Sequence, residues 1–139
     1  MITYSLTRTT SITDQEILDL YRSVGWSAYL QQPQNTLDAL ANSAVFWATT
    51  DDHLIGLIRG VTDGHTILYI QDLLVDPAYQ QQHVGTTLMK KMLDHYQNIG
   101  QTVLITDPEE RTRKFYESLD FLEIVPQTYG RAFVLERRF

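Results

Sequence analysis

The feature of this sequence that most restricts its fold is a run of three β-type segments in the middle of the chain. The segments cover residues 45–50, 54–60 and 66–75, and each is dominated by apolar and β-branched side chains. Only Asp51-Asp52-His53 and Thr62-Asp63-Gly64 separate them. Turns this short join antiparallel neighbours, because a parallel connection needs a much longer crossover. The sequence therefore predicts an antiparallel meander.

After the meander, the apolar period changes from that of a strand to that of a helix. Asp76-Pro77 ends the third strand, and a helical stripe then begins at Val84 and continues with Leu88, Met92 and Tyr96. Gly100 favours the end of this helix. A short apolar segment, 102–105, follows. This order predicts a crossover helix that leads into a parallel strand.

Further elements are predicted on both sides of this central part. Residues 2–6 alternate weakly, as in an edge strand. Thr13 and Glu16 have the spacing of a capping box for a helix that ends at Gly25, and a second helix is expected to begin near Asn35 or Thr36.

The C-terminal part predicts one more helix and two more strands. Asp107-Pro108 is typical of a helix start, with Asp107 as the cap, and the helix is expected to reach Leu119. Residues 121–125 and 131–137 have the pattern of final strands. We therefore expect one domain, 1–139, of the α+β class. It would be an α/β sandwich whose mixed central sheet has about seven strands, flanked by about four helices.

Composition excludes several classes of function. The chain has no cysteine, which excludes disulfides, thiolate metal sites and a cysteine acyl-enzyme. The four histidines have no metal-ligand spacing, so we expect no metal. A net charge of −6 argues against a nucleic-acid partner. Neither a signal-peptide pattern nor an apolar run of roughly 18 residues is present, so we expect a cytoplasmic protein without a membrane partner.

The negative charge is concentrated in the first part of the chain. Residues 1–82 contain three basic and nine acidic side chains, whereas residues 83–139 contain eight of each. This asymmetry suits a cationic ligand in the first part and tolerates an anionic one in the second. The alternative is an ordinary acidic surface.

The segment 69–85 combines a strand, a polar turn and the start of a helix. Backbone N–H groups at such a turn have no acceptor within the helix, and the helix dipole favours an anion there. A phosphate or pyrophosphate would fill that need, and Gly85 would allow a close approach. The glycine pattern of a dinucleotide-binding turn is missing. The alternative is a turn that binds nothing.

This segment resembles the GNAT superfamily of acyl-CoA-dependent N-acetyltransferases. The family's pyrophosphate turn reads Gln/Arg-x-x-Gly-x-Gly/Ala, and the chain has Gln80-Gln81-Gln82-His83-Val84-Gly85, with His83 in place of the central glycine. Lys114-Phe115-Tyr116-Glu117-Ser118-Leu119-Asp120-Phe121 is similar to the family's Phe-Tyr-x-x-x-Gly-Phe, with Asp120 in place of glycine. The order of the predicted elements also matches, over nearly the whole chain.

The resemblance implies a cosubstrate and the residues that would bind it. The cosubstrate is acetyl-CoA, and its acetyl group would pass to a primary amine by direct attack on the thioester, without an acyl-enzyme. The residues expected to bind it are Leu73, Leu74, Val75, Gln80, Gln81, Gln82, His83, Val84, Gly85 and Thr86. The strand before the turn would lie along the pantetheine arm, and a bulge there would free N–H groups for the thioester oxygen.

Two residues are candidates for proton transfer, and each has an alternative interpretation. The resemblance implies that Tyr116 serves the leaving sulfur, although Tyr116 also fits a core position. Asp72 is an acid between apolar residues, where a charge is costly unless it is used or paired. It is a candidate general base, and the alternative is a structural ion pair.

The acceptor contacts are expected near the first two helices, as the resemblance implies. Trp26 and Tyr29 follow a helix stop and would form an aromatic wall for an amine, or else pack as a satellite core. We expect a small cationic amine or a protein amine as the acceptor. The competing class is a non-catalytic acyl-CoA-binding regulatory module on the same fold. The sequence leaves the oligomeric state open, with a homodimer as one option.

Overall fold

The computed structural model describes residues 1–137. The chain forms two compact units, one from Met1 to Leu104 and one from Ile105 onward. The prediction of a single domain over the whole chain stays a prediction.

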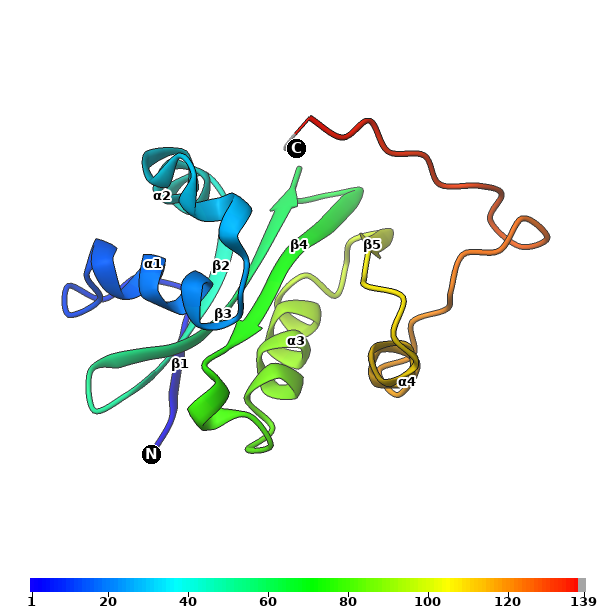
Figure 1. Cartoon of the computed structure of the whole chain (residues 1–139). Helices are drawn as coiled ribbons and strands as arrows, with labels where there is room; N and C mark the ends of the chain where they lie inside the picture. The colour runs from blue at the N-terminus through cyan, green and yellow to red at the C-terminus, as the bar shows by residue number, and fades with distance from the viewer. Residues whose placement is uncertain (138–139) are drawn as a thin grey trace. The chain divides into compact units, whose positions relative to one another are not determined.

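The first unit is built on one five-stranded mixed sheet (Figure 1). The strands are β1 (Thr3–Ser5), β2 (Ala44–Thr50), β3 (His53–Thr62), β4 (Ile67–Val75) and β5 (Gln101–Leu104), and they lie in this order across the sheet. β1 to β4 pair antiparallel, whereas β5 pairs parallel with β4. The predicted meander and the parallel strand that follows it are confirmed.

Helices cover both faces of this sheet. α1 (Asp14–Ser23), the 3₁₀ turn η1 (Ser27–Leu30) and α2 (Pro33–Ala41) lie on one face, and α3 (Val84–His95) lies on the other (Figure 1). A second 3₁₀ turn, η2 (Pro77–Tyr79), connects β4 to α3. This arrangement is the predicted sandwich, in which η2 and a short turn join the end of β4 to the start of α3.

The start of α1 confirms the predicted capping box. The Thr13 hydroxyl accepts a hydrogen bond from the Glu16 N–H at 3.1 Å, and a Glu16 carboxylate oxygen accepts one from the Thr13 N–H at 3.2 Å. Two N–H groups that no helical carbonyl can reach are thus satisfied. The helix buries Ile17, Leu20 and Tyr21 against the sheet.

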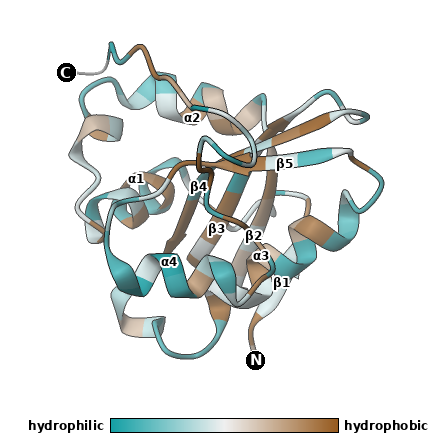
Figure 2. Cartoon of the chain, turned by 90° about the vertical axis from the view of Figure 1, so that its right-hand side faces the viewer, coloured by the Kyte–Doolittle hydropathy of each residue, from teal (hydrophilic) through white to brown (hydrophobic). Residues whose placement is uncertain are grey.

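The core lies on both faces of the central strands. Figure 2 shows that much of β2, β3 and β4 is hydrophobic, and most of their residues are buried. α3 adds four buried side chains, and it can lie close to β3 because residue 56 is glycine. A Cβ at Gly56 would meet the Leu74 carbonyl oxygen at 3.0 Å and a Val84 methyl group at 3.3 Å.

The second unit contains one helix, α4 (Glu110–Glu117), within the residues the structure describes. It starts later than the sequence predicts, because its N-cap is Glu109 rather than Asp107. The Asp107 carboxylate instead accepts the Glu109 N–H at 2.9 Å, which closes a turn just before the helix. Glu117 is followed by a turn in which Asp120 has a φ of +68°, consistent with its place at the family's glycine position.

The prediction of about seven strands is wrong, because the described residues form five. Residues 121–125 and 131–137, predicted as final strands, are neither helix nor strand. The large apolar side chains that suggested strands are exposed, with Leu122 at 73%, Phe133 at 89% and Leu135 at 73%. An alternating pattern records only a local preference, whereas a strand also needs a partner along its backbone.

Candidate functional site

The second half of β4 is paired on one side only. β5 pairs with β4 through Ile67–Ile70 and reaches no further among residues 1–137. On the other side, β3 continues to pair with β4 as far as Val75. Leu73, Leu74 and Val75, the residues predicted to lie along the cosubstrate, therefore present one open backbone edge.

A bulge marks the point where β5 stops. Arg59 on β3 pairs with Asp72, but the next residue, Gly60, pairs with Ile70, so Gln71 is the extra residue on β4. A bulge of this kind bends the strand and changes the direction of nearby side chains and backbone groups. This bulge lies at Gln71, two residues before the Leu73–Val75 segment for which the resemblance implied one, and the role of that segment toward the thioester oxygen stays a prediction.

The turn between β4 and α3 is held in an unusual backbone conformation. The Asp76 carboxylate accepts the Ala78 N–H at 2.9 Å, and the Gln80 side-chain amide donates to the Val75 carbonyl oxygen at 3.3 Å. Gln81 and His83 have φ values of +68° and +61°. Left-handed residues other than glycine cost on the order of 1–2 kcal/mol each. His83 thus has the left-handed conformation that glycine, the residue of the family motif at this position, adopts without steric cost.

The N-terminus of α3 has room and polarity for an anionic group. No side chain caps the helix at His83, and its first intrahelical bond runs from the Thr87 N–H to the His83 carbonyl oxygen at 2.9 Å. The N–H groups before Thr87 therefore point out of the helix end. A Cβ at Gly85 would meet only a Val75 methyl group, at 3.8 Å. These features fit a pyrophosphate.

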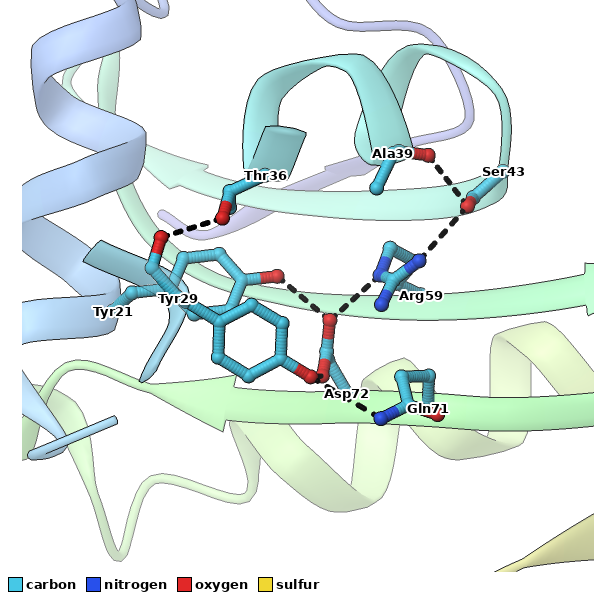
Figure 3. A network of polar contacts seen from close by, with 8 residues as sticks. All are labelled: Tyr21, Tyr29, Thr36, Ala39, Ser43, Arg59, Gln71 and Asp72. Carbon is cyan, nitrogen blue, oxygen red and sulfur yellow. Dashed lines mark hydrogen bonds and ion pairs between the residues drawn. The ribbon is translucent and has the colours of Figure 1, made fainter. Parts of the chain in front are cut away.

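Asp72 lies at the centre of a buried polar network on the α1 face of the sheet (Figure 3). Its side chain is 1% exposed. One carboxylate oxygen, Oδ2, accepts from the Tyr21 hydroxyl at 2.8 Å and from Arg59 Nε at 2.6 Å. The other oxygen, Oδ1, accepts from the Tyr29 hydroxyl. The structural ion pair weighed as an alternative for Asp72 is present.

Arg59 is the positive partner in this network. Its side chain is 10% exposed and also donates to the Ser43 hydroxyl at 3.2 Å. Burial lowers the pKa of the guanidinium, but the charge and hydrogen bond of Asp72 outweigh burial and raise it. The guanidinium therefore keeps its charge beside the Asp72 carboxylate, in a site that water barely reaches.

Both tyrosines of the network keep their protons at neutral pH. Burial is the main cause that raises the pKa of Tyr21, and the negative charge of Asp72 raises it further. The same two causes raise the pKa of Tyr29. Because the carboxylate only accepts, each tyrosine donates its hydroxyl proton to Asp72. The Tyr29 oxygen also accepts from the Gln71 side-chain amide at 3.3 Å.

Of the two residues predicted to contact the acceptor amine, Tyr29 contacts Asp72 and Trp26 lies beside Tyr29. The rings of Tyr21 and Tyr29 are 4.7 Å apart, and Trp26 lies 6.0 Å from Tyr29 and 6.1 Å from Tyr21, measured between centroids. Trp26 and Tyr29 are partly buried against the core. The aromatic cluster therefore borders the polar network.

Sequence reasoning missed Tyr21 and Arg59. Tyr21 lies at helical spacing from the apolar residues Ile17 and Leu20, and this core-like position hides the fact that its hydroxyl needs a partner. Arg59 carried a usable signal, because a charge inside one apolar strand calls for an opposite charge in a neighbouring strand. With the short turn between β3 and β4, Asp72 was the available partner.

Tyr116, predicted to serve the leaving sulfur, lies on α4 in the second unit. Its ring contacts those of Phe115 and Phe121, with centroids 5.0 and 5.7 Å away. Burial raises the pKa of Tyr116, and the charge of Asp107 adds to the effect. The phenol is therefore protonated at neutral pH, and its catalytic role stays a prediction.

No group of three or more histidine, cysteine, aspartate or glutamate side chains in residues 1–137 is placed to hold a metal ion. None of the helices in this part of the chain is both long and apolar enough to cross a membrane.

The mixed sheet has an open edge on β4 and leads into an uncapped helix, and this fold matches that of known proteins. The model of the acetyltransferase (GNAT) family matches residues 13–121. A GNAT-family acetyltransferase from Streptococcus pneumoniae TIGR4 is 30% identical, with a TM-score of 0.77 over 99% of this chain and 96% of its own. The chain belongs to the GNAT family of acetyltransferases.

Other solved structures share the fold at lower identity. The ribosomal-protein-S18-alanine N-acetyltransferase from Escherichia coli is 20% identical, with a TM-score of 0.73 over 94% of this chain and 88% of its own. A probable acetyltransferase from methicillin-resistant Staphylococcus aureus is 21% identical, with a TM-score of 0.76 over 97% and 100%. No relative is found among curated protein sequences. Family membership supports acyl transfer as the reaction.

Proposed function

We propose that this protein transfers an acetyl group from acetyl-CoA to a primary amine, which attacks the thioester directly without a covalent acyl-enzyme. The observation that carries this proposal is the open edge of β4 past Ile70, which continues into the turn and the uncapped start of α3. In a GNAT-family chain, this continuous backbone surface suits an extended acyl-CoA. The absence of cysteine agrees with direct attack.

The proposed binding residues act mainly through their backbone. Acetyl-CoA supplies an activated acyl group in its thioester. The residues proposed to hold it are Leu73, Leu74, Val75, Gln80, Gln81, Gln82, His83, Val84, Gly85 and Thr86. N–H groups on the open edge of β4 would stabilise negative charge on the thioester oxygen, and those at the start of α3 would bind phosphate.

We propose a cationic amine as the acceptor, either a small molecule or a protein amine. Residues 1–82 carry the whole net negative charge of −6, the Tyr29 hydroxyl contacts the buried carboxylate of Asp72, and the Trp26 ring lies 6.0 Å from that of Tyr29. Cationic amines should therefore react faster than neutral or acidic amines of equal size, and added salt should reduce the advantage. A preference for anionic acceptors would refute this part of the proposal.

The general base is proposed to involve Asp72, and the proton on the leaving sulfur is proposed to come from Tyr116. Three donors already surround Asp72. A proton from the amine would reach Asp72 through the Tyr29 hydroxyl, which also contacts the exposed Gln71. If Asp72 accepts the ammonium proton, Asp72→Asn should reduce the rate most at low pH, where free amine is scarcest. An equal loss at every pH would leave Asp72 with a structural role.

The decisive experiment follows the release of free CoA thiol from acetyl-CoA with a panel of amines. The panel should contain polyamines, amino acid amides, and peptides with a free N-terminus or lysine. We expect release that depends on one amine class, and mass spectrometry should show a 42 Da gain on that amine. Acetyl-CoA should also raise the melting temperature, because it binds the folded state.

The second candidate function is a regulatory module that binds acyl-CoA without catalysis. His83 favours it, because a side chain in place of the motif glycine stands at the turn that family members use for the pyrophosphate. A clear melting shift with acetyl-CoA, combined with no thiol release for any amine, would support this alternative. Absence of both signals would refute both functions.

We also propose a cytoplasmic location without a nucleic-acid or membrane partner, from the composition and net charge of the chain. A homodimer is the oligomeric state to test first. Light scattering coupled to size exclusion would measure the mass directly, and a value near 16.1 kDa would exclude the dimer.

A further inference from the structure

Tyr29 connects a buried carboxylate to the protein surface. Its hydroxyl donates to Asp72 Oδ1, and its oxygen accepts from the side-chain amide of the exposed Gln71 at 3.3 Å (Figure 3). Asp72 itself is 1% exposed. An acceptor molecule would therefore meet the Tyr29 hydroxyl before it could meet the carboxylate.

The network fixes the hydrogen-bonding direction of this hydroxyl. A tyrosine hydroxyl has one proton to donate, and an ionised carboxylate can only accept. Tyr21 and Arg59 both bind Oδ2, which leaves Oδ1 to Tyr29. With its proton committed to Asp72, Tyr29 can offer only lone pairs on its outward side. The group it recognises must be a donor, as the Gln71 amide already is.

We infer that the Tyr29 hydroxyl is a specificity-determining acceptor that selects cations bearing N–H groups, and that Asp72 is the residue that positions it. This inference rests on the proposed function, since it describes the acceptor side of amine acetylation. Asp72 acts here through Tyr29 and does not itself touch the substrate. The Gln71 amide marks the position that the amine N–H would take.

A purely aromatic site would behave differently. Trp26 and Tyr29, with ring centroids 6.0 Å apart, could attract any cation through their π faces. Such attraction favours alkylated ammonium groups at least as well as primary ones. A trimethylammonium group has no N–H to donate, so the hydroxyl would discriminate against it. The two interpretations therefore predict opposite preferences.

The first test compares two cations of the same chain length, butylammonium and butyltrimethylammonium. The affinity of each cation would be measured on the intact protein saturated with CoA. Each cation would compete for binding with the amine of the panel that is acetylated fastest. We expect butylammonium to bind about tenfold tighter or more, because a hydrogen bond to a charged group is worth at least that factor. Equal affinity, or tighter binding of the trimethyl cation, would overturn the inference.

The second test removes the hydroxyl. Tyr29→Phe should raise the KM for the amine about tenfold and abolish the preference for butylammonium, while acetyl-CoA affinity stays the same. Tyr21→Phe is the matched control, because it also removes one hydroxyl from Asp72 but leaves Tyr29 in place. The control should retain the preference for butylammonium even if its stability falls. A preference that survives in Tyr29→Phe would refute the inference.

The failure of this inference differs from the failure of the proposed function. A wild-type protein that acetylates amines but binds both cations equally would keep its function and lose the role of Tyr29. A wild-type protein that releases no thiol with any amine would lose the function itself. If Tyr29→Phe does not fold, the cation comparison on the wild type still decides the question.

Discussion

The buried network around Asp72 makes a quantitative prediction about stability. Asp72→Asn removes the negative charge while keeping the size of the side chain. Arg59, whose side chain is 10% exposed, then lies uncompensated beside a neutral amide. Two tyrosine donors also compete for one remaining acceptor oxygen. Removing one partner of a buried ion pair typically costs about 3–5 kcal/mol. We expect a loss near the lower end, about 3 kcal/mol, because the Asn carbonyl oxygen can still accept hydrogen bonds.

The assay is equilibrium unfolding in urea, followed by tryptophan fluorescence and circular dichroism. For a urea m-value of about 1.5–2 kcal/mol/M, a loss of about 3 kcal/mol moves the midpoint down by about 1.5–2 M. Asp14→Asn is the control, because the ion pair between Asp14 and Arg8 lies on the surface, at 66% and 38% exposure. That change should cost under about 1 kcal/mol.

The result that would refute this reasoning is a loss of less than 1 kcal/mol for Asp72→Asn with an unchanged m-value. It would mean that Arg59 finds water or another partner without cost. The double variant Arg59→Met with Asp72→Leu provides an independent check. If the penalty comes from an unpaired charge, this variant should be more stable than Asp72→Asn, since neither charge remains.

Three further predictions concern other parts of the chain. Tyr116→Phe should lower single-turnover acetyl transfer by about 10- to 1,000-fold without changing acetyl-CoA affinity, because it removes only the proposed proton donor; a wild-type rate would reduce Tyr116 to a packing residue. Gly85→Val should weaken CoA binding at least about tenfold in calorimetry, because a β-branched side chain would project at the proposed phosphate site. Gly85→Ala should fold at least as well as the wild type, since its Cβ would meet only a Val75 methyl group at 3.8 Å. Unchanged CoA affinity in the valine variant would show that the phosphate does not bind at this turn. Burial raises the pKa of Glu16, but hydrogen bonds from His53 and from two backbone N–H groups outweigh burial and lower the pKa below 4.5. Glu16 therefore stabilises the folded state above that pH and loses this contribution as the pH falls. The stability difference between wild type and Glu16→Gln should shrink from pH 6 to pH 3, and a constant difference would contradict the assignment.

The sequence predicted the part of the fold that local rules control. The capping box of Thr13 and Glu16 uses contacts within one helical turn, so its two residues were sufficient to predict it. The turn at Asp51 and Asp52 was also predictable, and both residues have positive φ values of 50° and 64° that aspartate tolerates. Strands joined by such turns have few alternatives to antiparallel pairing.

The predictions that failed concern residues whose structural partners lie far away in the sequence. Phe133 and Leu135 have strand propensity, but propensity cannot show whether another strand pairs with them. In the candidate site, the sequence offered Arg59 as a candidate partner for Asp72 but not the register that brings the two residues together. The answer required the register in which Arg59 lies directly opposite Asp72. The hydrogen-bonding direction of the Tyr29 hydroxyl, which donates to Asp72 and accepts from Gln71, follows only from that three-dimensional arrangement.

The pairing of Arg59 with Asp72 also acts as a check on strand alignment during folding. The two residues lie opposite each other, with the bulge at Gln71 immediately beyond them. If β4 slipped by one residue along β3, its side chains would change faces, and Asp72 would leave the face on which Arg59 is buried. A misaligned hairpin would thus leave the buried charge of Arg59 without its partner, at a cost of several kcal/mol, and the native alignment avoids this cost. The same contacts that orient a candidate substrate-binding hydroxyl therefore make the alternative alignments of the central hairpin unstable.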